Sequence, residues 1–426
     1  MKIGIIGLGK LGLPCAVAIA AKGHTVIGYD TNPEINSKVH PKLVLYSNEL
    51  NEDCTESIDN MLENTTLKFV DSVDEIIYNS EIIFIAVQTP HKSVFEGSNV
   101  MPVEREDFDY TVLVNCFKEL STKIEKQSES KIVTIISTVL PGTLRKYILP
   151  ITTSKIKLCY NPYFIAMGTV VYDFYNPEFI LLGIIDKEAE APVIEFYNTI
   201  TKSQVFVTTL ENAEMIKVSY NTFITTKIVL ANNIMEMCHK LPNTNVDDVM
   251  MALKKADTRL ISGAYLNGGM GDGGGCHPRD NIAMSWLSNK LNIQNNYYDF
   301  IMRKREAQTG FFVDIILEKQ KSTGLDIVIL GTAFKANTNL ETGSPAILLK
   351  NLLENIHIQC ETYDPYVNQG YKFELQKKIY FIGCKHDVFK TYDFKEGSVV
   401  IDPNRYIPLK DGVDIIHVGV GNQILQ

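Results

Sequence analysis

The sequence has few of the features that crosslink or anchor a chain. Its eight cysteines stand singly, with no C-x-x-C pair, and no histidine pair has the spacing of zinc ligands. We therefore expect a cytoplasmic protein with no disulfide framework and no structural metal. No apolar run reaches membrane-spanning length, and the first residues lack the cleavage region of a signal peptide, so no membrane partner is expected.

Excess positive charge is also missing. The formal net charge of -9 argues against nucleic acid as the main partner, although a local cleft could still be positive enough for an anionic ligand. With 45% apolar and 21% charged residues, the composition is that of an ordinary globular protein. A chain of 426 residues is long for one core, which predicts two or three domains.

The chain opens with a dinucleotide-binding pattern. An apolar run at 2–6, typical of a buried parallel strand, precedes glycines in G-x-G-x-x-G spacing and an apolar helix pattern. Such glycines let the backbone approach a pyrophosphate, which the helix N-terminus then holds. A second strand ends at Asp30, whose carboxylate would accept hydrogen bonds from ribose hydroxyls and repel a 2′-phosphate. We therefore expect NAD rather than NADP.

The same alternation continues along the chain. Apolar strands are expected at 81–87 and 131–137, with a helix over about 109–126 and a polar loop at 91–107 without a clear element. In an open parallel sheet, ligands lie at the carboxyl ends of the strands. The residues expected at the cofactor are Gly7, Gly9, Lys10, Leu11, Gly12, Asp30, Val87, Gln88, Thr89, Ser137 and Thr138.

A helical pattern from 211 to about 240 is long enough to connect domains. Lys217 and Asn221 lie four residues apart and hence on one face of that helix, although spacing alone favours a solvated position for Lys217. Strand patterns return at 326–331, 357–364, 398–402 and 414–419, with a helix over about 346–355. This second region lacks the full glycine pattern, so no second cofactor is assigned to it.

The expected fold is α/β, with two doubly wound Rossmann-like domains joined by a long central helix and a helical segment. The predicted domains are an NAD-binding domain at 1–205, a central helical segment at 206–320, and a second Rossmann-like domain at 321–426. A cleft between two α/β lobes is a usual place for a small-molecule site.

Cys276 lies in GDGGGCHPRD, at 271–280. Three glycines before it and a proline two residues after it predict a tight loop that opens a helix. Helix N-terminal dipoles and nearby cations favour the thiolate, which is the nucleophilic form of a cysteine. A nucleophilic cysteine together with a hydride acceptor suits the oxidation of an aldehyde through a covalent thioester.

These motifs resemble, in order, those of the nucleotide-sugar dehydrogenase family of UDP-glucose 6-dehydrogenase-like enzymes. The motifs are the glycine loop, STV at 137–139, NPYFIAMG at 161–168 with NPEFILLG at 176–183, the helix with Lys217 and Asn221, GDGGGCHPRD, and GTAFKANT at 331–338. The resemblance implies NAD-dependent, four-electron oxidation of the C6 hydroxyl of a UDP-sugar, with UDP-glucose to UDP-glucuronate as the first choice. A UDP-N-acetylhexosamine, GDP-mannose and TDP-glucose are the alternatives.

The family resemblance also implies residue roles. Cys276 would add to the aldehyde, Lys217 and Asn221 would stabilise the oxyanion, and Asp280 with Thr138 would hold water and move protons. The implied substrate contacts are Phe164, Ile165, Ala166, Lys217, Asn221, Arg259, Tyr265, Gly273, Phe334 and Lys335. Arg259 matches an arginine that reaches across a dimer interface in the family, which implies a homodimer joined through the central helices. The resemblance likewise implies that 206–320 serves dimerisation and catalysis and that 321–426 binds the nucleotide sugar.

The sequence departs from the family pattern at several positions. In the substrate loop, usually N-P-E-F-x-A-E-G, Tyr163 and Met167 replace both glutamates, and a tyrosine is no base near neutral pH. Thioester hydrolysis is therefore the step that these changes put in question. Thr342 stands where an arginine that contacts NAD is common, and Arg279 replaces a lysine.

Two other kinds of protein remain as rivals. One is a degenerate dehydrogenase that binds NAD and a nucleotide without turnover, which the lost glutamates suggest. The other is a two-electron β-hydroxyacid dehydrogenase, which shares the N-terminal domain and a helix with lysine and asparagine. The cysteine motif and the second α/β region at 326–426 count against the latter, because that class needs neither.

Overall fold

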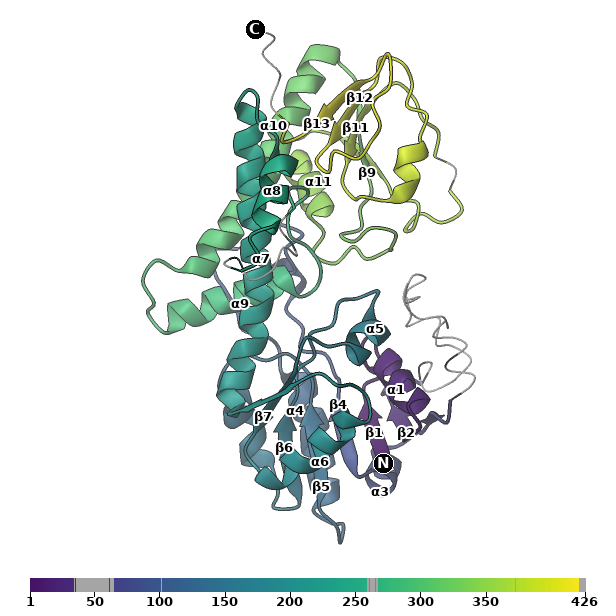
Figure 1. Cartoon of the computed structure of the whole chain (residues 1–426), viewed down its shortest axis with the longest axis vertical. Coiled ribbons are helices and arrows are strands. Elements are labelled where there is room, and N and C mark those ends of the chain that lie inside the picture. Colours follow the sequence, from purple (N-terminus) through teal and green to yellow (C-terminus); the bar gives the residue numbers. More distant parts are fainter. Residues whose placement is uncertain are drawn as a thin grey trace. The chain divides into compact units, whose positions relative to one another are not determined.

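The computed structural model describes residues 1–33, 35, 61, 65–100, 102–258, 260, 265, 267–371 and 373–420 (Figure 1). They form two compact units, each with its own sheet. The first comprises Met1–Pro90 and Phe108–Ser219, and the second comprises His91–Asp107 and Tyr220–Gln426. The expected α/β class with two mostly parallel sheets is confirmed. The three-domain division predicted from the sequence stays a prediction.

The first unit contains an eight-stranded sheet in the order β3-β2-β1-β4-β5-β6-β7-β8, parallel except where β6 meets β7. Its strands are β1 (Lys2–Ile6), β2 (Thr25–Tyr29), β3 (Lys68–Phe69), β4 (Ile82–Ile85), β5 (Lys131–Ile135), β6 (Ile156–Tyr160), β7 (Ile180–Ile184) and β8 (Val205–Thr208). Its helices include α1 (Gly12–Ala21), α3 (Val73–Asn79), α4 (Thr111–Ile124), α5 (Val170–Tyr175) and α6 (Lys187–Asn198). Strands β2 and β3 are added on one side of β1, and β4 and β5 are added on the other side, all parallel to it. This places the topological switch point between β1 and β4.

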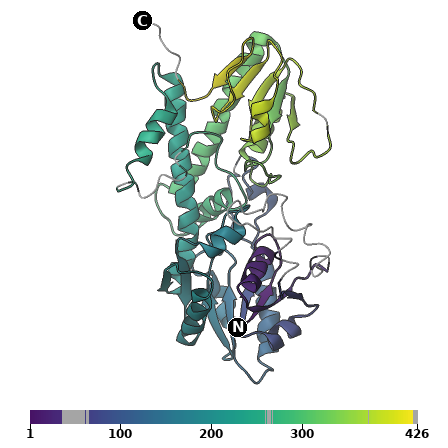
Figure 2. The ribbon, with the colours of Figure 1, turned by 45° about the vertical axis from the view of Figure 1, so that its right-hand side comes forward.

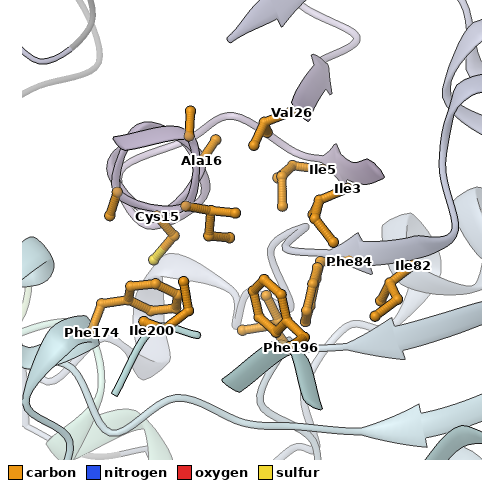
Figure 3. Packing of buried hydrophobic residues seen from close by; sticks show 14 of the residues in the cluster. Ile3, Ile5, Cys15, Ala16, Val26, Ile82, Phe84, Phe174, Phe196 and Ile200 are labelled. Atoms are coloured by element: carbon orange, nitrogen blue, oxygen red, sulfur yellow. The ribbon is translucent and has the colours of Figure 1, made fainter. Parts of the chain in front are cut away.

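The core of the first unit explains why β1 reads as an unbroken apolar run. Figure 3 shows Ile3 and Ile5 of β1 packed with Phe84 of β4 and Phe196 of α6. Small residues of α1, such as Ala16, let that helix lie close to the sheet. A parallel strand covered on both faces has no solvent side, so its sequence does not alternate between apolar and polar residues.

The second unit contains a five-stranded parallel sheet in the order β10-β9-β11-β12-β13, whose later strands are yellow in Figure 2. The strands are β9 (Ile327–Leu330), β10 (Cys360–Tyr363), β11 (Ile379–Ile382), β12 (Val399–Asp402) and β13 (Asp414–His417). The helices are α8 (Val246–Lys254), α9 (His277–Lys290), α10 (Tyr297–Thr323) and α11 (Pro345–Asn355), together with most of α7 (Leu210–Lys240). Phe312 of α10 packs on Phe381 of β11, with ring centroids 5.2 Å apart.

Two segments differ from the expectation. The loop at 91–107 contains a one-turn helix, η2 (Ser93–Phe95), and belongs to the second unit, where Phe95 packs with Ile282 and Met302. The strand expected to begin at 357 begins at Cys360, because His357 adopts a left-handed conformation (φ 60°) as α11 ends. Within the described ranges, every helix is too short or too polar to cross a membrane.

Candidate active site

The glycine turn after β1 has the shape that a dinucleotide needs. Gly7 is left-handed (φ 92°), and a Cβ on Gly12 would lie 1.9 Å from the Gly7 carbonyl oxygen, so α1 can start directly above the turn only with glycine. No atom lies within 4 Å of the position that a Cβ on Gly9 would take, so that face of the turn is open. These residues fit NAD, whose pyrophosphate would lie against the turn at the start of α1.

Asp30 follows β2 at the same edge of the sheet. Its Oδ2 accepts a hydrogen bond from the backbone N–H of Leu8 at 2.8 Å, and its Oδ1 accepts one from Asn32 at 2.9 Å. The carboxylate is half-buried, and an ionised carboxylate can accept several hydrogen bonds at once. The acid expected at the ribose therefore lies beside the glycine turn.

The ends of β4 and β5 are tied together, as their place in a parallel sheet predicts. The Thr89 hydroxyl donates to the Thr138 carbonyl oxygen at 2.7 Å, and the Ser137 hydroxyl donates to the Val87 carbonyl oxygen at 2.6 Å. Thr89 and Ser137 are buried, Thr138 is half-buried and the neighbouring Gln88 is exposed. The structure thus brings these predicted residues to one edge in the first unit.

Lys217 is 7% exposed, so the solvated position that spacing alone favoured is wrong. Its Nζ donates to the backbone carbonyl oxygen of Tyr163 at 2.8 Å and lies 5.0 Å from the centre of the Phe164 ring. That ring packs on Phe179, with centroids 4.8 Å apart. Desolvation of the ammonium is offset by the carbonyl and the ring face.

The predicted substrate loop at 161–168 lies against the core through its substituted positions. Tyr163 and Met167 both pack on the main apolar cluster, where glutamates could not lie without a partner. Burial and then the neighbouring Tyr197 raise the pKa of Tyr163 well above its ordinary value, so its hydroxyl is no base near neutral pH. Of the predicted contacts on this loop, Ile165 is half-buried and Ala166 is exposed, and the Ala166 N–H donates to Asp173 at 2.8 Å.

In the second unit, Cys276 occupies the position just before α9, and Pro278 lies in the first turn of that helix. The Cys276 carbonyl oxygen accepts from the backbone N–H of Asp280 at 2.8 Å. Cys276 is exposed, whereas the other cysteines in the described ranges are buried or half-buried. The expected helix-opening loop is therefore confirmed, and Cys276 is exposed at its end.

The glycines before Cys276 allow close contact with the segment after β9. A Cβ on Gly273 would lie 2.9 Å from Cβ of Phe334, and one on Gly274, which is left-handed (φ 88°), would lie 3.0 Å from the Phe334 ring. Any larger residue would push these two segments apart. The predicted contacts Gly273 and Phe334 therefore lie together, and Lys335 follows them half-buried.

Asn221 and Asp280 also meet in this unit. The Asn221 side-chain amide donates to Asp280 Oδ2 at 2.7 Å, and the Arg279 Nε donates to Asp280 Oδ1 at 3.1 Å. Asp280 is fully buried and Asn221 nearly so. Along α7, Asn221 lies one turn after Lys217, which is assigned to the first unit.

Two predicted substrate contacts remain, Tyr265 and Arg259. Tyr265 is left-handed (φ 63°) and partly exposed, and its ring lies edge-on to His277 with centroids 6.4 Å apart. Arg259 lies outside the described residues. In the described ranges, no group of three or more His, Cys, Asp or Glu side chains could hold a metal ion.

Sequence reasoning missed Arg305, because its RKRE surroundings resemble a solvated charge run. The side chain is 1% exposed, and its three nitrogens donate to backbone carbonyl oxygens of Asp272, Gly97 and Gly343 at 2.7, 3.0 and 3.1 Å. One guanidinium therefore joins the cysteine loop, the 91–107 segment and the loop before α11. No local pattern could have revealed this, since the three acceptors are far apart in sequence.

The fold and these residues define a dinucleotide-dependent dehydrogenase with an accessible cysteine. Residues 1–221 match the model of the UDP-glucose/GDP-mannose dehydrogenase family, NAD binding domain, and residues 211–305 match the central domain of the same family. The chain belongs to this family, and the expected NAD-dependent nucleotide-sugar 6-dehydrogenase class is confirmed.

Curated relatives and solved structures agree. The chain is 30% identical over 378 residues to UDP-glucose 6-dehydrogenase of Rickettsia bellii, covering 86% of this chain and 81% of the relative. It is 26% identical over 377 residues to GDP-mannose 6-dehydrogenase of Pseudomonas aeruginosa, and the match covers 85% of this chain and 81% of the relative. A UDP-glucose dehydrogenase structure from Pyrobaculum islandicum has the same fold, with a TM-score of 0.82, 22% identity and coverage of 99% and 98%.

Proposed function

We propose that the protein oxidises the C6 hydroxyl of a UDP-hexose, with UDP-glucose as the first choice, to the carboxylate through a thioester on Cys276. The observation that carries this proposal is the exposed Cys276 just before α9, the helix whose Asp280 accepts a hydrogen bond from Asn221. NAD, when bound at the glycine turn, accepts the hydride in each of the two oxidations. Two equivalents of NAD are therefore consumed for each sugar.

The cysteine solves a chemical problem of the second oxidation. An aldehyde carbon does not readily give up a hydride, whereas its tetrahedral adduct with a thiolate bears an oxyanion that expels one. Asn221, oriented by Asp280, and Lys217 are the donors proposed for that oxyanion. Asp280 and Thr138 are proposed to hold water and move protons.

The proposal is tested by supplying NAD⁺ with a panel of UDP-, GDP- and TDP-hexoses and counting NADH formed per sugar consumed. Two NADH per UDP-glucose support full oxidation, whereas one means that the aldehyde leaves the enzyme. No NADH with any sugar favours the non-catalytic binding protein. The panel also decides among substrates, because relatives named for GDP-mannose and UDP-N-acetyl-D-mannosamine keep those alternatives open.

We further propose a homodimer formed through α7. Phe223, Leu230 and Met237 recur at seven-residue intervals on this helix and are 47 to 56% exposed. Side chains at this spacing lie along one side of a helix, as in the seam of a coiled coil. In this dimer, Arg259 would serve the partner's site, as the sequence predicts. We also keep the cytoplasmic location as a proposal. L230D should shift the chain to monomer in light scattering, and an unchanged dimer would contradict this use of α7.

A further inference from the structure

The chain after β9 forms a short closed loop at 334–340. The Phe334 backbone N–H donates to the Leu340 carbonyl oxygen at 2.8 Å, which closes the loop at its base. A Cβ on Gly273 would lie 2.9 Å from Cβ of Phe334, so this base packs on the cysteine loop. Lys335, a predicted substrate contact, lies on the closed loop itself. The position of this loop therefore bears on how the second unit receives a nucleotide sugar.

Asn337, at the apex of the 334–340 loop, is held by its backbone and by its side chain. It adopts a left-handed conformation (φ 57°), and its N–H donates to Nδ1 of His386 at 2.8 Å. Its Nδ2 donates to Oδ2 of Asp387 at 2.8 Å. Its Oδ1 accepts from the Asp387 N–H at 3.1 Å and from the Tyr366 hydroxyl at 3.2 Å. The apex is therefore fixed to the segment that follows β11, and His386 provides the acceptor for its backbone.

The partners of His386 define which ring nitrogen carries the hydrogen. A backbone N–H only donates, so Nδ1, which accepts from Asn337, is the unprotonated nitrogen. Nε2 carries the hydrogen and lies 2.9 Å from Oδ2 of Asp364. The same oxygen accepts from the N–H groups of Thr332 and Ala333 at 2.8 and 3.0 Å. One carboxylate thus holds the start of the 332–344 segment directly and the apex of its loop through the imidazole.

We propose that His386, oriented by Asp364, is a positioning residue that orders the 334–340 loop for binding of the nucleotide sugar. This inference rests on the proposed function. His386 is fully buried, so it acts through Asn337 and not on the substrate. Lys335 lies two residues before Asn337, so a fixed apex restricts the positions that its side chain can reach. A loop that is ordered before the ligand arrives loses less conformational entropy on binding, and the affinity is higher for that reason.

The competing role for His386 is simply to fill space in the core. Its ring packs on Tyr366 and Phe389, with centroids 4.7 and 5.4 Å apart. Two amide variants separate the roles, because each replaces one nitrogen. In H386N the shorter amide places its oxygen near the position of Nδ1, where it can accept from Asn337, and nothing reaches Asp364. In H386Q the longer amide can donate to Asp364, and the acceptor for Asn337 is lost.

The first measurement is the affinity for UDP-glucose, by isothermal titration calorimetry on the full-length enzyme without NAD⁺, so that no turnover occurs. For H386Q we expect a Kd about 10-fold higher than for wild type, because binding must then order the loop. H386N should bind more tightly than H386Q, although both variants unfold at a lower temperature than wild type. In steady-state assays of H386Q, the KM for UDP-glucose should rise about 10-fold and kcat should change less.

The second measurement is hydrogen exchange of the peptide that contains the 334–340 loop, in enzyme without ligand. The Asn337 amide should exchange faster in H386Q than in H386N or wild type, because H386Q removes the acceptor of that N–H. This readout reports on the loop itself and does not depend on the identity of the sugar. Equal protection of the Asn337 amide in H386Q and wild type would contradict the proposal.

The reactivity of Cys276 shows whether the change stays confined to the loop. Asp364 and Arg305 still hold the two ends of the 332–344 segment in H386Q, through Thr332 and Gly343. Alkylation of Cys276 by iodoacetamide, located by peptide mass spectrometry, should therefore keep its wild-type rate. A changed rate would reveal a general disturbance of the second unit and would overturn the specific role.

D387A keeps the test available where a buried substitution prevents folding, because Asp387 is exposed and bonds to the Asn337 side chain. It should raise the Kd for UDP-glucose about 3-fold. The proposal is overturned if folded H386Q binds UDP-glucose like wild type, if H386N and H386Q bind equally weakly, or, where neither folds, if D387A leaves Kd unchanged. Failure of the proposed function looks different, since wild type itself would then neither bind nor oxidise UDP-glucose, while hydrogen exchange would still decide whether His386 holds the loop.

Discussion

The two sheets of this protein begin with the same device and use it differently. Gly7 after β1 and Gly331 after β9 are both left-handed, with φ of 92° and 89°. Each donates its N–H to the last residue of the neighbouring strand, Tyr29 at 2.9 Å and Tyr363 at 2.7 Å. An aspartate follows that neighbouring strand in both cases and accepts backbone N–H groups from the turn.

The two aspartates differ in their burial and in their hydrogen-bond partners. Asp30 is half-buried and accepts from Leu8 and Asn32. Asp364 is fully buried, and its two oxygens accept from Thr332, Ala333, Tyr366, Val367 and the ring of His386. Asp30 thus lies half-buried beside the glycine turn, whereas the fully buried Asp364 uses both of its oxygens to hold a loop.

The helix that follows each turn differs in the same sense. In the first unit, α1 begins at Gly12, directly over the turn. In the second, α11 begins only at Pro345, and the intervening 332–344 segment carries Phe334 and Lys335. Asp364 fixes the start of this segment, and the Asn337 N–H donates to Nδ1 of His386 at 2.8 Å. The same local motif thus leads directly into a helix in the first unit and into a loop in the second, and the assignment of a single dinucleotide site stays a prediction.

The largest expected effect separates the two acids. D364N should lower the free energy of unfolding by roughly 4 kcal/mol, because a buried carboxylate with five donors would become an amide that cannot accept from all of them. D30N should weaken NAD binding about 10-fold and change stability little. Urea unfolding and NADH fluorescence titration measure the two quantities. Equal loss of stability in both variants would break the comparison.

The second effect concerns the glycines that allow close approach. G12A places a Cβ 1.9 Å from the Gly7 carbonyl oxygen, so the turn must shift and NAD affinity should fall on the order of 100-fold. G383A places a Cβ 2.5 Å from the Gly331 carbonyl oxygen and should lower stability without changing NAD affinity. NADH titration of both purified variants makes the test, and weakened NAD binding by G383A would contradict the separate roles.

The third and smallest effect is a difference in pH dependence between two buried acids. Glu214 of α7 accepts from the backbone N–H groups of Gly142 and Leu144, at 2.6 and 2.9 Å. Burial raises its pKa from 4.5 to about 7. For Asp364, burial also acts to raise the pKa, but His386 and the backbone donors outweigh it and lower the pKa below 3.8. The number of donors decides which acid stays ionised.

The signs follow from linkage. With its raised folded pKa, Glu214 contributes stability below about pH 4.5, and this is lost as the pH rises toward about 7. Asp364 contributes stability above its ordinary pKa, and this is lost as the pH falls through its lowered folded pKa. E214Q should flatten a decline of roughly 2 kcal/mol between pH 4.5 and 7. Urea midpoints measured across that range provide the check, and a slope unchanged in E214Q would contradict it.

Much of this architecture could be predicted because it is local in sequence. The glycine turn, Asp30, the long α7 helix and the helix-opening Cys276 each depend on spacing within one or two elements, and all were expected. Strand β11 was not anticipated, because four apolar residues between polar flanks are too few to show a period.

The side-chain partners could not be predicted in the same way. Asp272 bonds to Thr225, and Asp364 bonds to His386, through contacts that only the packing of separate elements creates. Lys217 could be assigned to the site by resemblance, but its bond to the Tyr163 carbonyl oxygen depends on how the substrate loop folds. Spacing identifies which residues share a face, whereas tertiary packing decides what that face meets.

The central claim is that the sulfur of Cys276 carries the sugar between two oxidations. The direct measurement is to quench the enzyme in acid during turnover with NAD⁺ and UDP-glucose, digest it, and locate the adduct by peptide mass spectrometry. The account predicts a sugar acyl group on the peptide that contains Cys276, and neither adduct nor uronate with C276S. Two NADH per sugar from C276S would contradict it.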